Sequence, residues 1–320
     1  MANIRDLAKV AKVSVSTVSR VLNNYPYVTQ KKREAVLQAI RQLNYYPNIN
    51  AVHLSKGKTM VVGILLPFIN HSYYSTLLEG IAEEANSLGY KLMIIQTYYQ
   101  EERELEALEM LKHKQIDSLI VTSRGLSLNR YEEYLPYGKM VMCEKVNHGG
   151  FQSIYIDQYE AFREAYHFLV NKGHKDIGYC TGREKGSSSL LRRKAFANEL
   201  NSLEKPIREE WIFPNSFFLQ DGNVLVGKLL ELKAMPSALI VTNDMVAAGT
   251  ILESNRRGIN IPTDLAIIGF NNDPIAEAMD ITTVSLPLRK MGGEAFKNTL
   301  REGCTTPIEM PFSFIERNTV

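Results

Sequence analysis

Hydroxyl and guanidinium side chains recur at helical spacing near the start of this chain, between residues 14 and 20. Ser16 and Arg20 are separated by one helical turn, so a helix over these residues presents both on one side. Arginine matches the paired acceptors on the major-groove edge of guanine, and serine hydroxyls bond to bases or phosphates. The spacing therefore predicts contacts with the bases and phosphates of a nucleic acid.

The charge distribution of the chain supports this prediction. Residues 1–58 contain ten Lys or Arg and only two acidic residues, a balance of +8. Residues 59–320 contain 27 basic and 33 acidic residues, a balance of −6. Phosphates attract the first segment and not the second, so binding to nucleic acid is expected at the amino-terminal end.

Apolar spacing predicts three short helices that position these side chains. The predicted inward faces are Ile4, Leu7, Ala8 and Ala11 in the first helix, Val15, Val18 and Leu22 in the second, and Val36, Ile40 and Leu43 in the third. Ser14 and Thr29 are plausible caps of the second and third helices. Only about three residues separate the first two helices, which predicts a steep crossing of the helix-turn-helix type.

A brief helix is predicted next, over Pro47–Gly57, because proline favours a helix start and glycine a helix end. About two turns of helix are too short to be stable alone in water. We expect this segment to fold only when docked, which makes it a candidate switch.

From Met60 onward the pattern changes to buried strands that alternate with amphipathic helices. The predicted strands are Met60–Leu66, Lys91–Gln96, Ser118–Thr122, Met140–Cys143, Ser153–Ile156, Ile177–Cys180, Ala238–Val241 and Leu265–Phe270. The predicted helices are Tyr73–Ser87, Glu101–Lys112, Tyr159–Asn171, Leu190–Asn201, Gly222–Leu232, Met245–Gly258 and Leu288–Leu300. This order predicts an α/β body of two lobes, each a doubly wound parallel sheet, with a cleft between them.

Composition restricts the possible classes of protein. The start of the chain has no apolar signal-peptide core, and no apolar run is long enough for a membrane helix, so we expect a cytoplasmic protein. Cys143, Cys180 and Cys304 are an odd number without a CxxC pair, which predicts neither a disulfide framework nor a zinc site. The glycine-rich phosphate loops, HExxH and GxSxG are absent from the sequence, so an enzyme is not expected and no cofactor is implied.

The run Asp6-Leu-Ala-Lys-Val-Ala, followed by Val-Ser-Val-Ser-Thr-Val-Ser-Arg-Val-Leu-Asn-Asn and Leu-Asn-Tyr-Tyr-Pro-Asn, resembles the lactose repressor and galactose repressor (LacI/GalR) family. The resemblance implies that the helix beginning at Val15 and Ser16 binds in the major groove of DNA, where Arg20 contacts a base and Asn23 contacts the DNA backbone. It also implies a hinge segment that pairs in a homodimer, with Leu54 wedged into the minor groove beside Ala51. The remaining candidates for DNA contact are Ser14, Thr17, Tyr27 and Lys32.

The same resemblance implies a periplasmic-binding-protein-like body that closes on a small effector. The candidate effector residues are His71, Tyr73, Tyr74, Glu144, Arg192, Asn243 and Asn271. Arg192 takes the place of the arginine in the family's Arg-x-x-Gly-Phe segment, although the adjacent Arg193 leaves the register open. This set favours a neutral polyhydroxylated ligand, such as a sugar, over a phosphate. The implied domains are 1–46, a hinge at 47–58 and a body at 59–320, with lobes of about 59–157 plus 287–316 and 158–286.

Three departures from the family pattern carry consequences. Lys12 stands where a glycine is common in the turn, so that turn needs either a lysine with positive φ or another geometry. Asn50 and His53 stand where the hinge usually carries a basic or a small residue. Asn271 replaces a frequent aspartate, so the pocket should differ in selectivity, with Asp273 as a partial replacement.

These observations together predict a sequence-specific transcriptional repressor that binds a pseudo-palindromic operator as a homodimer under the control of a small effector. A dimer is expected rather than a tetramer because no heptad repeat follows Arg317. A secreted solute-binding protein with the same body is the alternative. It would need a signal peptide and would have no use for the basic amino-terminal segment.

Overall fold

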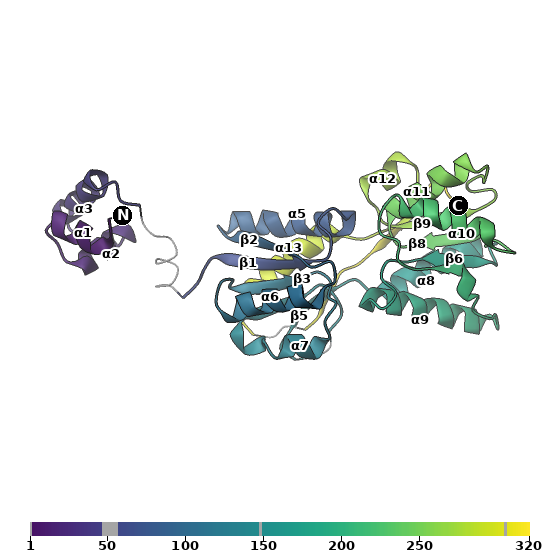
Figure 1. Cartoon of the computed structure of the whole chain (residues 1–320), viewed down its shortest axis with the longest axis horizontal. Helices are drawn as coiled ribbons and strands as arrows, with labels where there is room; N and C mark the ends of the chain where they lie inside the picture. The colour runs from purple at the N-terminus through teal and green to yellow at the C-terminus, as the bar shows by residue number, and fades with distance from the viewer. Residues whose placement is uncertain (1, 47–56, 147–148, 304–305) are drawn as a thin grey trace. The chain divides into compact units, whose positions relative to one another are not determined.

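The computed structural model describes residues 2–46, 57–146, 149–303 and 306–320. The chain forms two compact units, Met1–Thr59 and Met60–Val320 (Figure 1). The expected hinge residues Ala51 and Leu54 lie outside the described residues.

The first unit is a bundle of three helices, α1 (Ile4–Val10), α2 (Val15–Leu22) and α3 (Gln30–Gln42). Its core is built on Leu7, Val18 and Val36, which have no exposed surface. The Ser14 hydroxyl caps α2 as expected, accepting a hydrogen bond from the Thr17 N–H at 3.2 Å. The predicted helix-turn-helix is confirmed.

Details of this unit differ from the prediction at two helix starts. Val15, expected on the inward face of α2, is 41% exposed, whereas Val21 is buried. Val21 completes the buried stripe with Val18 instead. Thr29 precedes α3, but its side chain makes no capping hydrogen bond.

Lys12 adopts the left-handed conformation in the turn between α1 and α2, with φ 53°. The turn therefore keeps a glycine-like backbone although the residue has a side chain. Such a conformation costs roughly 1–2 kcal/mol for a residue other than glycine.

The body contains two six-stranded sheets. The first sheet has the order β11-β5-β4-β3-β1-β2, and all its strand pairs are parallel. Its strands are β1 (Val61–Leu66), β2 (Lys91–Gln96), β3 (Ser118–Val121), β4 (Lys139–Met142), β5 (Gln152–Tyr155) and β11 (Ile308–Glu309). Its helices are α5 (Ser72–Ser87) and α13 (Leu288–Leu300) on one face and α6 (Glu101–Lys112) and α7 (Leu128–Glu132) on the other, with the short 3-10 turn η1 (Leu135–Tyr137).

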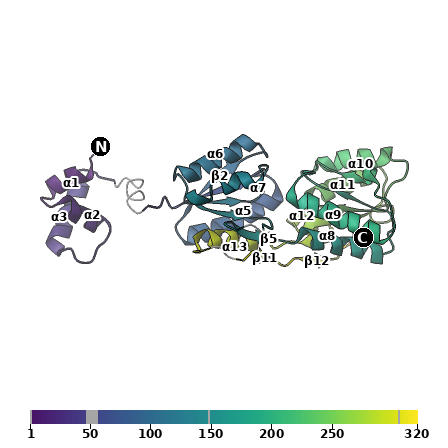
Figure 2. The ribbon, with the colours of Figure 1, turned by 90° about the horizontal axis from the view of Figure 1, so that it is seen from below.

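The second sheet has the order β12-β10-β9-β8-β6-β7, with only β12 antiparallel to its neighbour. Its strands are β6 (Ile177–Cys180), β7 (Ile212–Phe213), β8 (Ala238–Val241), β9 (Ala266–Asn271), β10 (Thr283–Ser285) and β12 (Ser313–Ile315). Figure 2 shows α10 and α11 on one side of this sheet and α8 on the other. The helices are α8 (Gln158–Asn171), α9 (Ser187–Ser202), α10 (Asp221–Glu231), α11 (Asp244–Arg256) and α12 (Pro274–Ala278), with the 3-10 turn η2 (Glu209–Trp211).

The continuous apolar run in β1 is explained by burial on both faces of the first sheet. Val62, Ile64 and Leu66 pack with α5 and α13, whereas Leu65 packs on the opposite side with α6. All four side chains are fully buried. The predicted α/β class with two doubly wound sheets is confirmed.

The carboxyl-terminal segment divides between the two lobes. The segment 287–316 was expected in the first lobe, and α13 and β11 do lie there. β12 instead pairs with β10 in the second sheet, so the chain crosses between lobes once more after β11. No amphipathic period could reveal this, because β12 has only three residues. No helix in the described ranges is long and apolar enough to span a membrane.

Candidate functional site

The exposed side of α2 carries most of the predicted DNA-binding residues. Ser14, Val15, Ser16, Arg20 and Asn23 are exposed, and Thr17 is partly exposed. The Arg20 guanidinium lies 5.9 Å from the centre of the Tyr25 ring. The Ser14 hydroxyl is hydrogen-bonded to those of Ser16 (2.8 Å) and Thr17 (2.9 Å). The structure therefore presents hydroxyls and a guanidinium on one exposed face.

Two further candidates lie beyond α2. Tyr27 is 85% exposed, and its ring makes an edge contact with Tyr25. Lys32 is exposed in the first turn of α3. Arg33 differs, because its Nη2 donates to the Tyr25 carbonyl at 2.8 Å and fixes the loop between α2 and α3.

The predicted effector residues come together at one cavity of ≈ 110 Å³ in the body. All seven line it: His71, Tyr73, Tyr74, Glu144, Arg192, Asn243 and Asn271. The lining follows the carboxyl ends of β1 to β9, so strands of both sheets contribute. This is the edge at which doubly wound sheets bind ligands.

The first lobe contributes an aromatic group at the start of α5. The His71 ring caps this helix, with Nδ1 accepting from the Tyr73 N–H at 3.3 Å. Burial lowers the pKa of His71 to about 4, so the ring is neutral at pH 7. The Tyr74 hydroxyl is bonded to that of Tyr99 at 2.9 Å. Burial raises the pKa values of Tyr73 and Tyr74 above their ordinary range, which keeps both phenols neutral.

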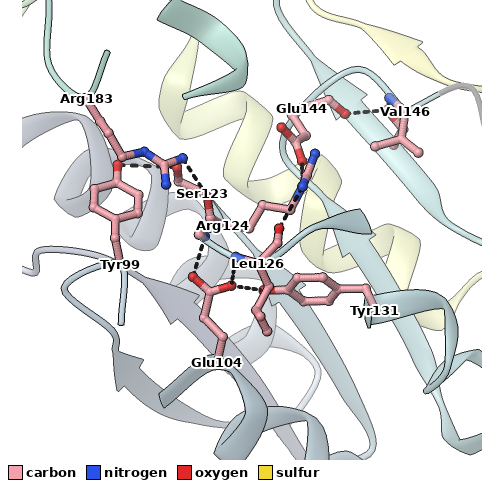
Figure 3. A network of polar contacts seen from close by, with 11 residues as sticks. Tyr99, Glu104, Ser123, Arg124, Leu126, Tyr131, Glu144, Val146 and Arg183 are labelled. Atoms are coloured by element: carbon pink, nitrogen blue, oxygen red, sulfur yellow. Dashed lines mark hydrogen bonds and ion pairs between the residues drawn. The ribbon is translucent and has the colours of Figure 1, made fainter. Parts of the chain in front are cut away.

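The loop after β3 is held by a buried carboxylate, as Figure 3 shows. Glu104 has no exposed surface and accepts hydrogen bonds from the N–H groups of Gly125 and Leu126 and from the Tyr131 hydroxyl. The loop carries Arg124, whose Nε donates to the Glu144 carboxylate. Glu144 was expected to meet ligand hydroxyls, and one of its oxygens is already engaged by this arginine.

The two adjacent arginines in α9 lie in different environments. Arg192 lines the cavity and is 8% exposed, and its Nε and Nη2 donate to Gln158 Oε1 at 3.1 and 2.7 Å. Its guanidinium carbon lies 5.1 Å from the centre of the Phe270 ring. Burial lowers the pKa of Arg192 to about 10, so it remains charged at pH 7. Arg193 is not among the described lining residues; it pairs with Glu209 at 2.6 Å and is partly exposed.

The second lobe contributes two asparagines. Asn243 caps α11 and donates to the Phe217 carbonyl at 2.9 Å, and its Nδ2 lies 3.4 Å from His71 Nε2 of the first lobe. Asn271 has φ 104°, a conformation that side chains rarely adopt. Asp273, expected to replace the missing aspartate in part, is not among the described lining residues. Its carboxyl faces Ser72 and Asn271.

A second buried carboxyl belongs to Asp244, the first residue of α11. Asp244 accepts hydrogen bonds from the Asp273 N–H and the Thr283 hydroxyl, both at 2.7 Å. Burial raises the pKa of Asp244 to about 8. This group is therefore mainly uncharged at pH 7.

Aromatic side chains join the two lobes beside the cavity. The Phe68 ring of the first lobe contacts Phe217 and Phe218 of the second, with ring centres 5.4 and 5.6 Å apart. His71 contacts Phe218 at 6.1 Å. A second cavity of ≈ 280 Å³ adjoins the first and shares Tyr73 with it.

The cavity is also lined by residues that the sequence patterns did not predict, among them Tyr99, Ser123, Gln158, Arg183 and Phe217. Each follows the carboxyl end of a parallel strand, so the rule that ligands bind at this edge would have indicated their loops. Arg183 follows β6, and its position depends on contacts with the other lobe that local patterns do not reveal.

Comparisons with known proteins agree with this architecture. Residues 3–48 match the family described as bacterial regulatory proteins, lacI family, and residues 166–319 match a periplasmic binding protein-like domain. The uncharacterized HTH-type transcriptional regulator YkvZ of Bacillus subtilis (strain 168) is 39% identical over 323 residues, which cover 100% of both chains.

Solved structures share the fold. The lac repressor dimer bound to operator and the anti-inducer ONPF has a TM-score of 0.83 at 21% identity, covering 99% of this chain and 98% of that chain. A LacI family regulator from Lactobacillus casei with bound sucrose has a TM-score of 0.75 at 24% identity, covering 81% and 99%. A helix-turn-helix unit joined to a two-lobed ligand-binding body defines a ligand-responsive transcriptional regulator. This chain belongs to the lacI family of bacterial regulatory proteins.

Proposed function

We propose that this protein is a transcriptional repressor that binds a pseudo-palindromic operator as a homodimer and responds to a small effector. The observation that carries the proposal is the convergence of all seven expected effector residues on one cavity between the lobes. The hydroxyls, amides and aromatic rings there suit a sugar or related polyhydroxylated ligand. The sucrose bound to the Lactobacillus casei regulator supports this ligand class.

The proposed control passes from the cavity to the segment 47–58, which we assign as a hinge. A ligand that contacts both lobes favours one angle between them, and two hinges pair on DNA only when the lobes of the dimer are suitably placed. Effector binding then shifts the population between DNA-competent and incompetent states. Leu54 is proposed as the side chain that wedges into the minor groove, with Ala51 beside it.

Selection of bound sequences from randomised DNA tests the DNA-binding part. The wild type should enrich a two-fold-related site, and Arg20→Ala should lose enrichment at one or more bases of each half-site. Arg41→Ala, which removes an exposed charge from α3, is the matched control and should weaken binding without changing the selected sequence. Equal sequence preference in Arg20→Ala and wild type would reject the base-reading role.

Measurement of operator affinity with and without a panel of sugars tests the effector part. A sugar that binds should change operator affinity in the wild type and in Arg193→Ala but not in Arg192→Ala. The sign of the change distinguishes an inducer from a corepressor. An effect that persists in Arg192→Ala would reject this site.

A further inference from the structure

The charges that line the effector cavity do not balance. The phenols of Tyr73 and Tyr74 are neutral at pH 7, and His71 is neutral as well. The carboxylate of Glu144 is paired with Arg124. Arg183 and Arg192 remain, and no carboxylate in the described part of the chain lies within ion-pair distance of either. The cavity lining therefore carries two positive charges that no carboxylate of the described residues compensates.

Arg192 is the more deeply buried of the two. The Arg192 guanidinium donates hydrogen bonds to the uncharged side-chain oxygen of Gln158 and lies over the ring of Phe270. A buried ion without a counter-ion is unfavourable, because neither an amide nor a ring replaces water fully. A negatively charged ligand would remove this cost.

Arg183 is held in place by the opposite lobe through one of its donors. Its Nη2 donates to the Arg124 carbonyl at 2.6 Å, and its guanidinium carbon lies 4.1 Å from the centre of the Tyr99 ring. Its Nε is buried and has no hydrogen-bond partner among the described residues. An arginine has five N–H donors in a planar fork that suits carboxylate and phosphate oxygens. The Arg183 guanidinium, which lies over the Tyr99 ring, can therefore donate hydrogen bonds to a carboxylate or phosphate oxygen.

The start of α9 adds donors between these two arginines. Ser187, Ser188 and Ser189 form its first turn and line the cavity. Within the described ranges no side chain caps this helix, and its first turn has no acidic residue. Unpaired N–H groups and the positive end of the helix dipole favour an anion at this position.

We propose that the effector carries an anionic group, a carboxylate or a phosphate, bound between Arg183, Arg192 and the first turn of α9. The polyhydroxylated part contacts the tyrosines and asparagines of the cavity. This differs from the neutral ligand that the sequence favours, because Arg183 was not recognised as a cavity residue. The proposal deepens the proposed function, but its test of binding does not depend on DNA.

Thermal unfolding and calorimetric titration test the charge requirement with defined probes. The probes are inorganic phosphate, D-glucose 6-phosphate, D-glucuronate and D-glucose, each compared with chloride at equal ionic strength. We expect phosphate to raise the unfolding temperature of the wild type, and at least one anionic sugar to do so more than glucose. A larger effect of glucose 6-phosphate indicates a phosphate group, and a larger effect of glucuronate indicates a carboxylate.

Variants locate the effect. Arg183→Gln should weaken anion binding by about tenfold or more, as expected for loss of charge-assisted hydrogen bonds. Arg183→Lys should restore part of it, and Arg193→Gln, on the arginine next to Arg192 but not among the described lining residues, should bind as the wild type does. If Arg183 only links the lobes, Arg183→Gln will lower the unfolding temperature without ligand but leave the response to every probe unchanged. The proposal is overturned if Arg183→Gln responds to every probe as the wild type does, or if neither protein responds to any probe.

Operator binding under the same conditions separates this inference from the proposed function. Anion binding through Arg183 without a change in operator affinity would support the site and reject the effector control. Control of operator affinity by neutral sugars alone would support the proposed function and overturn the anionic group.

Discussion

Replacing Glu104 by glutamine tests whether the cavity is held in place by a buried carboxylate. Glu104 Oε2 accepts from the Leu126 N–H at 3.0 Å and the Tyr131 hydroxyl at 2.7 Å, while Oε1 accepts from the Gly125 N–H. Glutamine has nearly the same shape but replaces one acceptor oxygen with a donor. In either orientation of the amide, at least one buried donor then faces another donor.

The magnitude follows from these three hydrogen bonds. An unsatisfied buried donor costs roughly 1–3 kcal/mol, and the remaining bonds lose the assistance of a charge. The sum is about 3 kcal/mol, which corresponds to a fall of about 6–12 °C in the unfolding temperature for a unit of this size. Because the loop also positions Arg124 against Glu144, the affinity for an effector should fall as well.

Differential scanning calorimetry of the body transition measures the effect. Glu102→Gln is the matched control, because Glu102 lies on the exposed side of the same helix and should change the unfolding temperature by no more than about 1 °C. Equal unfolding temperatures for Glu104→Gln and the control would show that the carboxylate does not stabilise the loop.

Other substitutions give independent checks. In urea unfolding, Gly80→Ala should destabilise the body by about 3 kcal/mol or more, because the added Cβ would lie 1.8 Å from the Arg289 carbonyl oxygen. Gly227→Ala is the control: its added Cβ would meet open space, so this variant should be as stable as the wild type or more stable. Asp244 has a pKa raised from 3.8 to about 8, so its contribution to the free energy of unfolding is complete at acid pH and is lost as the pH rises toward 8. Asp244→Asn should therefore flatten the pH dependence of the free energy of unfolding by up to about 1.4 kcal/mol per pH unit, and equal slopes in the variant and the wild type would refute this. Lys12→Gly should stabilise the helix-turn-helix unit by about 0.5–1 kcal/mol in hydrogen exchange, because glycine adopts the positive φ freely; a destabilised variant would contradict this.

Long apolar runs and helical spacing were enough to predict both sheets and most helices. The run in β1 is such a case, because burial on both faces leaves only apolar residues. Strands of two or three residues, such as β7 and β12, have no measurable period and were missed. Their pairing depends on partners far away in the chain.

The candidate site was predicted to the extent that its residues follow strand ends or match family positions. Tyr73 and Asn271 are of this kind, and both line the cavity. Arg183 is not, because its placement arises from Tyr99 and Arg124 of the other lobe, which are distant in sequence. Interactions across the lobes therefore determine which charged side chains line the cavity, and local sequence patterns do not reveal such interactions.

The first lobe is completed by residues that come late in the chain. α13 packs on α5, and β11 extends the first sheet beside β5, although both follow the whole second lobe in sequence. A polypeptide ending at residue 286 would lack both elements and expose the apolar side of α5. During synthesis, the first lobe therefore cannot complete its sheet or the helical layer over α5 until nearly the whole chain has been made.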